Sequence, residues 1–495
     1  MSNIQVTHDM SLNNARSESS IAINPNDPQK MVGGSKKFRN ITNYDFTLAT
    51  AYSTDGGQTW NDSADVPLIS GWPILTDPAL AWDDSGNVFL VALACNNPPT
   101  IDVLGIAIYK SSDGGKTWSA PNQIHTSSGD DKQWAAGDGN PASPFHGRVY
   151  AVWDDGSDMR FARTLDHGAT WIGTGGNPAG SVLVNNSFAP EINVAANGTI
   201  YIAWIDGSDI QMIVSNDGGD SFHSVASPAS GVTTLSSSLP HPHGWPVFPG
   251  GSFRVLTLPT ACAGAGQTVA AAWADYRQGV SRIYYALSNN GGASWLTGPS
   301  GQPLLYQQVA ANQQHFHPQI VSAPGGVMGC AFYEFGPKPS KYLIDVILAL
   351  SYDGGSTFSQ QFTVTDQPWD PSIDAPWSHG DPNVTFIGDY FGLDASNEGL
   401  YPLWTDTRTG IQELWTALFT PDPCQHLCDE VDELQTEVDD LWDAFSSGEI
   451  PPPPRTPQRV AAVLRYIHQL EARLRHLRQL LKQCRALHPE SSCEA

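Results

Sequence analysis

Hydrophobic positions in residues 1–420 form short runs, each closed by Gly, Asp or Asn, which is typical of strands joined by tight turns. One run, 77–82, is followed by the turn 84–87, and a second, 190–194, is followed by 196–198. A later strand of each unit ends in an aromatic residue and an acidic turn, as at Trp153, Trp204, Trp273 and Trp404. The pattern predicts one antiparallel β-unit, repeated along the chain.

A second repeat places the turns more firmly. The phrase Ser-x-Asp-x-Gly-x-Thr-Trp occurs in six strict or looser copies, spaced by roughly 50–75 residues. Its side-chain acceptors are Asp55, Asp113, Asp166, Asp217, Asn290 and Asp353. Such an oxygen can accept from backbone N–H groups further along the turn, and the glycines adopt a positive φ at no steric cost. We expect these boxes to be structural turns between the third and fourth strands of each unit.

Counting the units gives seven. Inner strands are expected to begin near Ser19, Asp77, Gln133, Pro190, Phe253, His317 and Gly388. The seventh unit has only three strands and no box, so residues 4–7 are expected to supply its fourth strand. The fold class is therefore all-β, a seven-bladed β-propeller over residues 1–421, closed by the N-terminal strand.

The boxes resemble those of the sialidase-like Asp-box (BNR repeat) β-propeller superfamily, over about residues 1–420. That superfamily includes sialidases, plant-polysaccharide hydrolases, lectins and non-enzymatic receptors. The resemblance implies the fold more than any activity, because the boxes of such propellers lie at the blade periphery.

After Pro421 the spacing changes from period two to period seven. Apolar residues recur at 3-4 spacing over 424–445 and again over 463–484, which predicts two amphipathic helices with a coiled-coil-like seam. The proline run 451–454 separates them, and Thr456-Pro457 is a good start for the second. Residues 422–495 are predicted to form an antiparallel helical hairpin. Trp442 and Tyr466, off the seam, are expected to be exposed and could join hairpins of several chains.

Four cysteines lie in this tail. The antiparallel register pairs Cys424 with Cys484, and Cys428 with Cys493 is the expected second bridge. A metal site using His426 and His488 is the alternative, although close CxxC spacing is lacking. Disulfides indicate an extracellular or cell-surface location. The chain nevertheless begins without an apolar signal segment, so the location stays open.

The charge narrows the choice of partners. The net charge is −25, which disfavours nucleic acid and anionic membranes. No apolar run is long enough for membrane insertion, and we expect no cofactor and, apart from the alternative in the tail, no metal. The expected partners are a glycan or glycoprotein surface and, through the hairpin, further copies of the chain.

Function in propellers usually lies at the axis, where loops from every blade converge. Residues at the starts of the inner strands form the predicted axial funnel: Arg16, Lys132, Trp134, Glu191, Arg254, His317 and Asp389, with Asp131 and His315 beside them. A catalytic set of Asp77, Glu18 and Tyr390 can be drawn from the same positions, with Asp77 as the acid.

Two interpretations follow. A retaining sialidase needs three arginines that clamp a carboxylate, a Tyr nucleophile activated by a Glu, and an Asp acid/base. The Arg-Ile-Pro phrase of sialidases is missing, and Arg277 and Arg408 fit structural hairpins better than a clamp. The favoured interpretation is a glycan- or protein-recognition module displayed or oligomerised by the hairpin. The alternative is an exo-acting, sialidase-type glycoside hydrolase that uses axial carboxylates and Tyr390.

Overall fold

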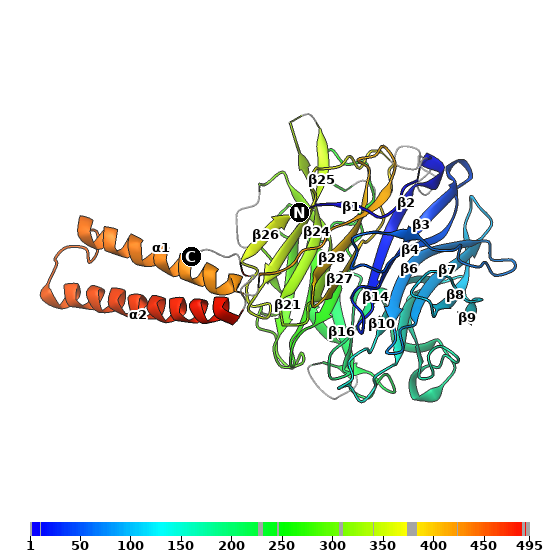
Figure 1. Ribbon diagram of the computed structural model, residues 1–495, viewed down its shortest axis with the longest axis horizontal. Coiled ribbons are helices and arrows are strands. Elements are labelled where there is room, and N and C mark those ends of the chain that lie inside the picture. Colours follow the sequence, from blue (N-terminus) through cyan, green and yellow to red (C-terminus); the bar gives the residue numbers. More distant parts are fainter. Residues whose placement is uncertain are drawn as a thin grey trace. The chain divides into compact units, whose positions relative to one another are not determined.

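A computed structural model describes residues 2–9, 11–225, 231–244, 247–305, 310–339, 341–373, 384–422, 424–487 and 491. The chain divides into two compact units, Met1–Phe419 and Thr420–Ala495. The first unit is built from strands and the second from two helices (Figure 1). No helix within the described ranges is long and apolar enough to cross a membrane.

The first unit is a seven-bladed β-propeller. Six blades follow the chain, with strand orders β2-β3-β4-β5, β6-β7-β8-β9, β10-β11-β12-β13, β14-β15-β16-β17, β19-β20-β21-β22 and β23-β24-β25-β26. Their strands are β2 (Arg16–Ile23), β3 (Met31–Asn40), β4 (Asp45–Ser53), β5 (Asn61–Asp62), β6 (Ile74–Trp82), β7 (Val88–Asn96), β8 (Asp102–Ser111), β9 (Asn122–His125), β10 (Asp130–Gly137), β11 (Val149–Asp155), β12 (Asp158–Thr164), β13 (Ser181–Asn185), β14 (Phe188–Val194), β15 (Ile200–Asp206), β16 (Asp209–Ser215), β17 (His223–Ser224), β19 (Thr260–Ala263), β20 (Val269–Asp275), β21 (Arg282–Ser288), β22 (Gln302–Pro303), β23 (Gln314–Ser322), β24 (Met328–Pro337), β25 (Tyr342–Ser351) and β26 (Gln360–Thr363).

The seventh blade joins the two ends of the propeller segment. Its order is β1-β29-β28-β27, from β1 (Ile4–Gln5), β27 (Gly392–Ser396), β28 (Gly399–Asp406) and β29 (Glu413–Thr416). Ile4 lies opposite Thr416 in an antiparallel pair, and the backbone N–H of Val6 donates to the Leu414 carbonyl at 2.8 Å. The first strand thus supplies what the seventh unit lacks.

Two features of the sheets differ from the sequence expectation. The fifth blade begins at Thr260, not near Phe253, because 237–259 forms a long connection in which Phe253 bridges to Thr385. The Phe253 ring packs against Phe316 and Phe335, which explains its apolar character without a strand. In addition, β18 (Thr233–Ser236) pairs with β16, an extra strand that no turn signal predicted.

The six boxes share one hydrogen-bond pattern. In the first, Ser53 Oγ donates to Asp55 Oδ1 at 2.8 Å and accepts from the Gly57 N–H at 2.9 Å. Asp55 in turn accepts from the Thr59 N–H at 2.9 Å and from the Thr59 hydroxyl at 2.5 Å. Burial alone would raise the pKa of Asp55, but the bonds from Thr59 and Ser53 lower it overall. Each box therefore ties its own turn and leaves no group aimed at the axis.

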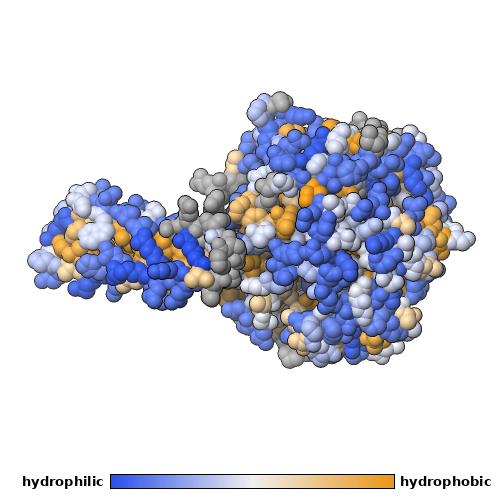
Figure 2. Space-filling view, in the orientation of Figure 1, coloured by the Kyte–Doolittle hydropathy of each residue, from blue (hydrophilic) through white to orange (hydrophobic). Residues whose placement is uncertain are grey.

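The second unit is a hairpin of α1 (Gln425–Ser447) and α2 (Pro457–Leu487), which run antiparallel (Figure 1). Its seam is apolar and is bordered by hydrophilic residues (Figure 2). Cys424 and Cys484 form a disulfide. Cys428 is also disulfide-bonded, while Cys493, the partner expected for it, lies outside the described residues, as does His488.

One expectation for the hairpin surface is wrong. Trp442 is half-buried rather than exposed, because its indole N–H donates to Glu471 Oε1 across the hairpin at 3.0 Å. Tyr466 does lie on the surface, with 48% of its area exposed, and its hydroxyl bonds to Glu437.

Candidate axial pocket

Five inner strands share an irregularity that positions the site. Each breaks its register with the second strand of its blade at one point near its start. At each break one residue adopts a φ between 47° and 56°, a region that residues other than Gly rarely occupy. These residues are Glu18, Asp77, Lys132, Ala189 and His317. Bulges of this kind re-aim a side chain and are frequent next to functional sites.

Three of the five re-aimed side chains meet in one pocket. Glu18, Asp77 and Lys132 line a cavity of about 620 Å³ together with Asp131, Arg254 and Lys36. Its apolar walls include Tyr44, Phe46, Phe188 and His243. Aliphatic side chains, among them Leu93, Val103 and Leu256, complete these walls, and a concave apolar site with a few convergent polar groups is the usual form of a ligand-binding pocket.

Asp389 anchors the cations of this pocket. Its carboxylate is fully buried and accepts from Lys132 Nζ at 2.6 Å and from Arg254 Nε at 2.8 Å, with a second bond from Arg254 Nη2. Burial would raise the pKa of Asp389, but the charges of Lys132 and Arg254 hold it far below its usual range. Asp389 is thus an ionised support beneath the pocket, not a free acid.

Two further carboxyl groups behave differently. Glu18 is 2% exposed, and burial followed by repulsion from Asp77 raises its pKa well above the ordinary value, despite Lys36 and Lys132. Asp131 is affected in the same way, because burial raises its pKa to about 6 even with Lys132 beside it. Asp77 accepts a hydrogen bond from Thr76 Oγ1 at 3.1 Å. The pocket therefore offers carboxyl groups that can hold a proton near neutral pH.

Lys36 is a member of the pocket that sequence reasoning missed. Its ammonium group lies 4.1 Å from the centroid of the Phe46 ring and 5.0 Å from that of Phe386, and it donates to the Tyr44 hydroxyl at 3.2 Å. Such contacts stabilise a buried cation. The available signal was the pair Lys36-Lys37 within a predicted strand, because side chains alternate along a strand and one of two neighbours must point inward.

Tyr390 lies beside the pocket but is poorly suited to be a nucleophile. It lines a small adjoining cavity of about 30 Å³ with Lys132, Trp134 and Glu191, and its ring packs edge-on against Trp134. Burial, then Asp77 and Glu18, raise the pKa of Tyr390 well above its ordinary value. The phenolate needed for attack is therefore disfavoured.

The remaining funnel residues do not line the main pocket. Arg16 turns away and pairs with Asp9 at 2.5 Å. Glu191 is held by the Ala261 N–H and by Thr260 Oγ1, both at 2.9 Å, and so links two blades. His315 bonds to Glu334 at 3.0 Å. His317 is buried, and burial lowers its pKa to about 3, so it stays neutral.

The described residues do not assemble a three-arginine clamp. Arg254 is the one arginine in the lining of the main pocket, where the other cations are lysines. Arg277 pairs with Asp275 and Arg408 with Asp406, each within its own hairpin. This arrangement removes the central element of a sialidase-type carboxylate site.

Comparisons with known proteins bear on the repeat and the fold. The family model for the BNR/Asp-box repeat matches residues 51–62, which contain the whole first box, Ser53 to Trp60. No curated protein matches the chain. Similar solved structures include a protein of unknown function from Dyadobacter fermentans, at 13% identity, covering 70% of this chain and 97% of that one, with a TM-score of 0.43.

Two sialidases are among the other similar structures. The Hadza microbial sialidase Hz136 is 16% identical, with 64% of this chain and 63% of that chain covered and a TM-score of 0.40. The NanB sialidase from Streptococcus pneumoniae is 11% identical, with 66% of each chain covered and a TM-score of 0.43. This chain thus spans just under two thirds of either sialidase, and TM-scores of this size carry no function from one chain to another. The BNR/Asp-box match, the six boxes with one bonding pattern and the seven-bladed ring identify the fold as the sialidase-like Asp-box (BNR-repeat) β-propeller.

Proposed function

We propose that the axial pocket binds carbohydrate and that the chain recognises a glycan, free or on a glycoprotein. The supporting observation is the pocket itself, where buried acids and cations converge between aliphatic and aromatic walls. Hydroxyl groups of a sugar can donate to Asp77 and Asp131 and accept from Lys132 and Arg254. Phe188, which is partly exposed, offers flat apolar surface to the C–H face of a sugar ring.

The charge balance of the lining favours a neutral sugar. Three acids (Glu18, Asp77 and Asp131) face three cations (Lys36, Lys132 and Arg254), and Asp389 beneath them already engages two of the cations. A strongly anionic sugar would have to compete with Asp389 for those cations. We therefore expect neutral hexose-type termini to bind more tightly than sialylated ones.

A glycan array with the full chain tests this proposal. Asp131→Asn should weaken binding at least tenfold, because a hydroxyl donated to a carboxylate loses its charge-assisted bond. Asp158→Asn is the matched control in the same blade, since Asp158 is partly exposed on β12 and should leave binding unchanged. Equal binding by both variants, or no binding to any glycan by the wild type, would refute the site.

Hydrolysis is a second candidate, favoured by one observation. The raised pKa of Glu18 beside a second carboxyl group, Asp77, is the arrangement by which two acids divide the roles of general acid and base. In this candidate Glu18 protonates the leaving oxygen as the glycosidic bond breaks, and Asp77 takes a proton from the water molecule whose oxygen forms the new bond to the anomeric carbon. The Tyr390 nucleophile of the sialidase-type scheme has no part in it.

Turnover separates the two candidates. If the pocket hydrolyses glycosides, Glu18→Gln and Asp77→Asn should each lower kcat at least 100-fold while glycan binding persists. Asn tolerates the left-handed backbone at position 77, so the second variant should fold. Binding without turnover of any substrate in a panel of glycosides leaves recognition as the function.

We further propose that the helical hairpin joins copies of the chain and so multiplies weak glycan contacts. Its surface supports this at Tyr466, a large side chain that is 48% exposed. Light scattering on the full chain should report an oligomer, and Tyr466→Glu should shift it toward the monomer. The control is Arg475→Glu on the same helix. A monomeric wild type would exclude assembly.

A further inference from the structure

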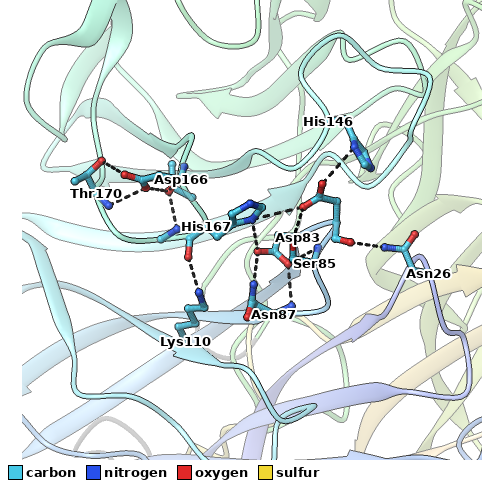
Figure 3. A network of polar contacts seen from close by, with 12 residues as sticks. Asn26, Asp83, Ser85, Asn87, Lys110, His146, Asp166, His167 and Thr170 are labelled. Atoms are coloured by element: carbon cyan, nitrogen blue, oxygen red, sulfur yellow. Dashed lines mark hydrogen bonds and ion pairs between the residues drawn. The ribbon is translucent and has the colours of Figure 1, made fainter.

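A group of histidines and aspartates gathers where the second and third blades meet, apart from the axial pocket. Asp83 and Asp84 form the turn between β6 and β7. His146 lies in the connection before β11, and His167 occupies the third Asp box, directly after Asp166. Figure 3 shows both imidazoles directed toward the acidic turn from the neighbouring blade.

Asp83, Asp84 and His167 each offer one ligand atom within 4.8 Å of the other two, whereas His146 reaches Asp84 alone in this group. His167 Nδ1 lies 3.0 Å from Asp83 Oδ2 and 3.5 Å from Asp84 Oδ1. His146 Nδ1 lies 3.3 Å from Asp84 Oδ2. Ligands about 2.0–2.1 Å from a tetrahedral zinc ion lie roughly 3.3 Å from each other. The two separations of His167 Nδ1 from Asp83 and Asp84 lie on either side of that value.

The carboxylate of Asp83 is fixed in advance. Its Oδ1 accepts from the N–H groups of Ser85 and Asn87 at 2.9 and 2.8 Å, and its Oδ2 accepts from Asn87 Nδ2 at 2.6 Å (Figure 3). Asp83 is fully buried, so these bonds hold one oxygen toward His167. Partners of this kind orient the ligands in protein metal sites.

The two histidines are also placed at some cost in backbone freedom. His167 has a φ of 56° at the box position where the other five copies carry Gly with φ between 67° and 79°, so this box holds an imidazole in a conformation that favours Gly. Beside His146, a Cβ on Gly147 would lie 2.9 Å from Asp84 Oδ1. Only glycine at 147 lets Asp84 come this close to His146.

A second group of the same composition serves as a contrast. His125 lies 2.8 Å from Asp130, and Asp155 is nearby. Asp155, however, is paired with Arg160 at 2.8 Å, and Asp130 also accepts from the Trp153 indole at 3.1 Å. In the first group the nearby Lys110 donates to the His167 carbonyl and not to either carboxylate. The carboxylates of the first group contact histidines and the Ser85 hydroxyl, and none of the ion pairs among the described residues joins them to an Arg or a Lys.

We propose that Asp83, Asp84 and His167 bind one divalent metal ion of the zinc type, which links the second and third blades, while His146 holds the second oxygen of Asp84. Imidazole and carboxylate ligands suit Zn²⁺ and similar transition metals, whereas Ca²⁺ prefers six to eight oxygen ligands. Because the ligands come from two blades, the ion stabilises the folded ring by binding it and not the unfolded chain. This site is independent of the proposed glycan pocket.

Zinc titration of the full chain tests the site. After treatment with a chelator and its removal, calorimetry with ZnCl₂ at pH 7.5 should give one tight site per chain, and zinc should raise the thermal unfolding midpoint. The double variant His146→Gln/His167→Gln should lose that site and the shift in the midpoint. His125→Gln is the matched control and should retain both. Asp84→Asn provides a second variant that alters only a partly exposed carboxylate, and it should weaken zinc binding at least tenfold.

Three outcomes would overturn the proposal. The first is a wild-type chain that binds no zinc and whose unfolding midpoint changes with pH but not with zinc. That result is expected of histidine–aspartate ion pairs without a metal. The second is a tight zinc site that survives in the double variant, which would place it elsewhere. The third is tight binding of CaCl₂ in the same titration with no binding of zinc.

Discussion

Single charged residues decide how the axial pocket is held. Asp389 has no exposed surface, and its two cations come from β10 and from the connection before β19. An ion that far from water is tolerated only with full compensation, and removing one partner from such a pair typically costs about 3–5 kcal/mol. Exposed pairs contribute far less, about 0–1 kcal/mol. Buried and exposed lysines of the same chain should therefore respond differently to one substitution.

We predict that Lys132→Met lowers the free energy of unfolding by about 3–5 kcal/mol, because it leaves the buried Asp389 with Arg254 as its remaining cationic partner. Lys341→Met is the matched control: Lys341 pairs with Asp370 at 2.7 Å but is 53% exposed, so the loss should be below about 1 kcal/mol. Urea denaturation at pH 7 measures both. Equal losses would show that Asp389 is not sustained by Lys132.

Glu191 makes a second prediction, on pH. Burial raises its pKa from 4.5 to about 7 despite bonds from Ala261 and Thr260, so the folded chain binds this proton more tightly than the unfolded chain. The resulting stability is complete below about pH 4.5 and is lost as the pH rises through 7. The Glu191→Gln variant cannot ionise at this position. Between pH 5 and pH 8 the wild type should therefore lose about 2–3 kcal/mol of unfolding free energy relative to this variant. A constant difference across that range would contradict the assignment.

The site could be predicted from sequence only in part. Glu18, Asp77, Lys132 and Arg254 were found because they precede or begin predicted inner strands, where loops converge on the axis. Arg16 and His317 occupy comparable positions, but Arg16 pairs with Asp9 and His317 is buried in the protein interior. Their orientation depends on side-chain partners distant in sequence. Lys36 enters from a second strand, which a list of strand starts does not include.

At the scale of elements, the Asp box shows what is required of its acceptor. Five of the six boxes use Asp, and the fifth box along the chain uses Asn290. Its Oδ1 accepts from the Ser294 N–H at 2.9 Å, and its Nδ2 donates to Ser294 Oγ at 2.8 Å. The turn thus needs an oxygen for the backbone N–H, whereas the second atom can be donor or acceptor. A negative charge is not essential.

The second box tests this. Asp113 accepts from the Thr117 N–H at 3.0 Å and from the Thr117 hydroxyl at 2.6 Å. Asp113→Asn should lower the free energy of unfolding by less than about 0.5 kcal/mol, because the Thr117 hydroxyl can accept from the new amide as the Ser294 hydroxyl accepts from Asn290. Asp113→Ala removes the acceptor and should cost about 1–2 kcal/mol, as for a lost helix cap. Chemical denaturation of the two variants compares them, and similar costs would mean that charge, not the acceptor, matters.

Elements set by local sequence were the ones most accurately predicted. Box turns, the start of α2 at Pro457 and the three-stranded seventh unit each depend on a few neighbouring residues. The bulges at Glu18 and Lys132 could not be predicted, because nothing in the local residue types favours a positive φ there. The predicted strand start at Phe253 was wrong for a related reason. An aromatic residue in a packed connection gives the same apolar pattern as one in a strand.

The whole molecule depends on closing a ring. Apolar clusters extend from blade to blade, as where Val32 of β3 packs in one cluster with Leu80 of β6 and Tyr109 of β8. Each blade is therefore stabilised by two neighbours, and an open ring would leave two blades with an uncovered face. The first and seventh blades do not have such an uncovered face, because β1 leads into the first blade and pairs with β29 of the seventh, more than 400 residues later.

We predict that this closure sustains the whole propeller and not the seventh blade alone. Val6 is 2% exposed and packs with Leu403 and Leu414, so Val6→Asp buries an unpaired carboxylate and should lower the unfolding midpoint by at least 5 °C in a single transition. Gln5→Asp, one residue earlier and half-buried, is the matched control and should lower it by less than 2 °C. Calorimetry would contradict the prediction if Val6→Asp produced a separate low-temperature transition, because the seventh blade would then unfold by itself while the other six stayed intact.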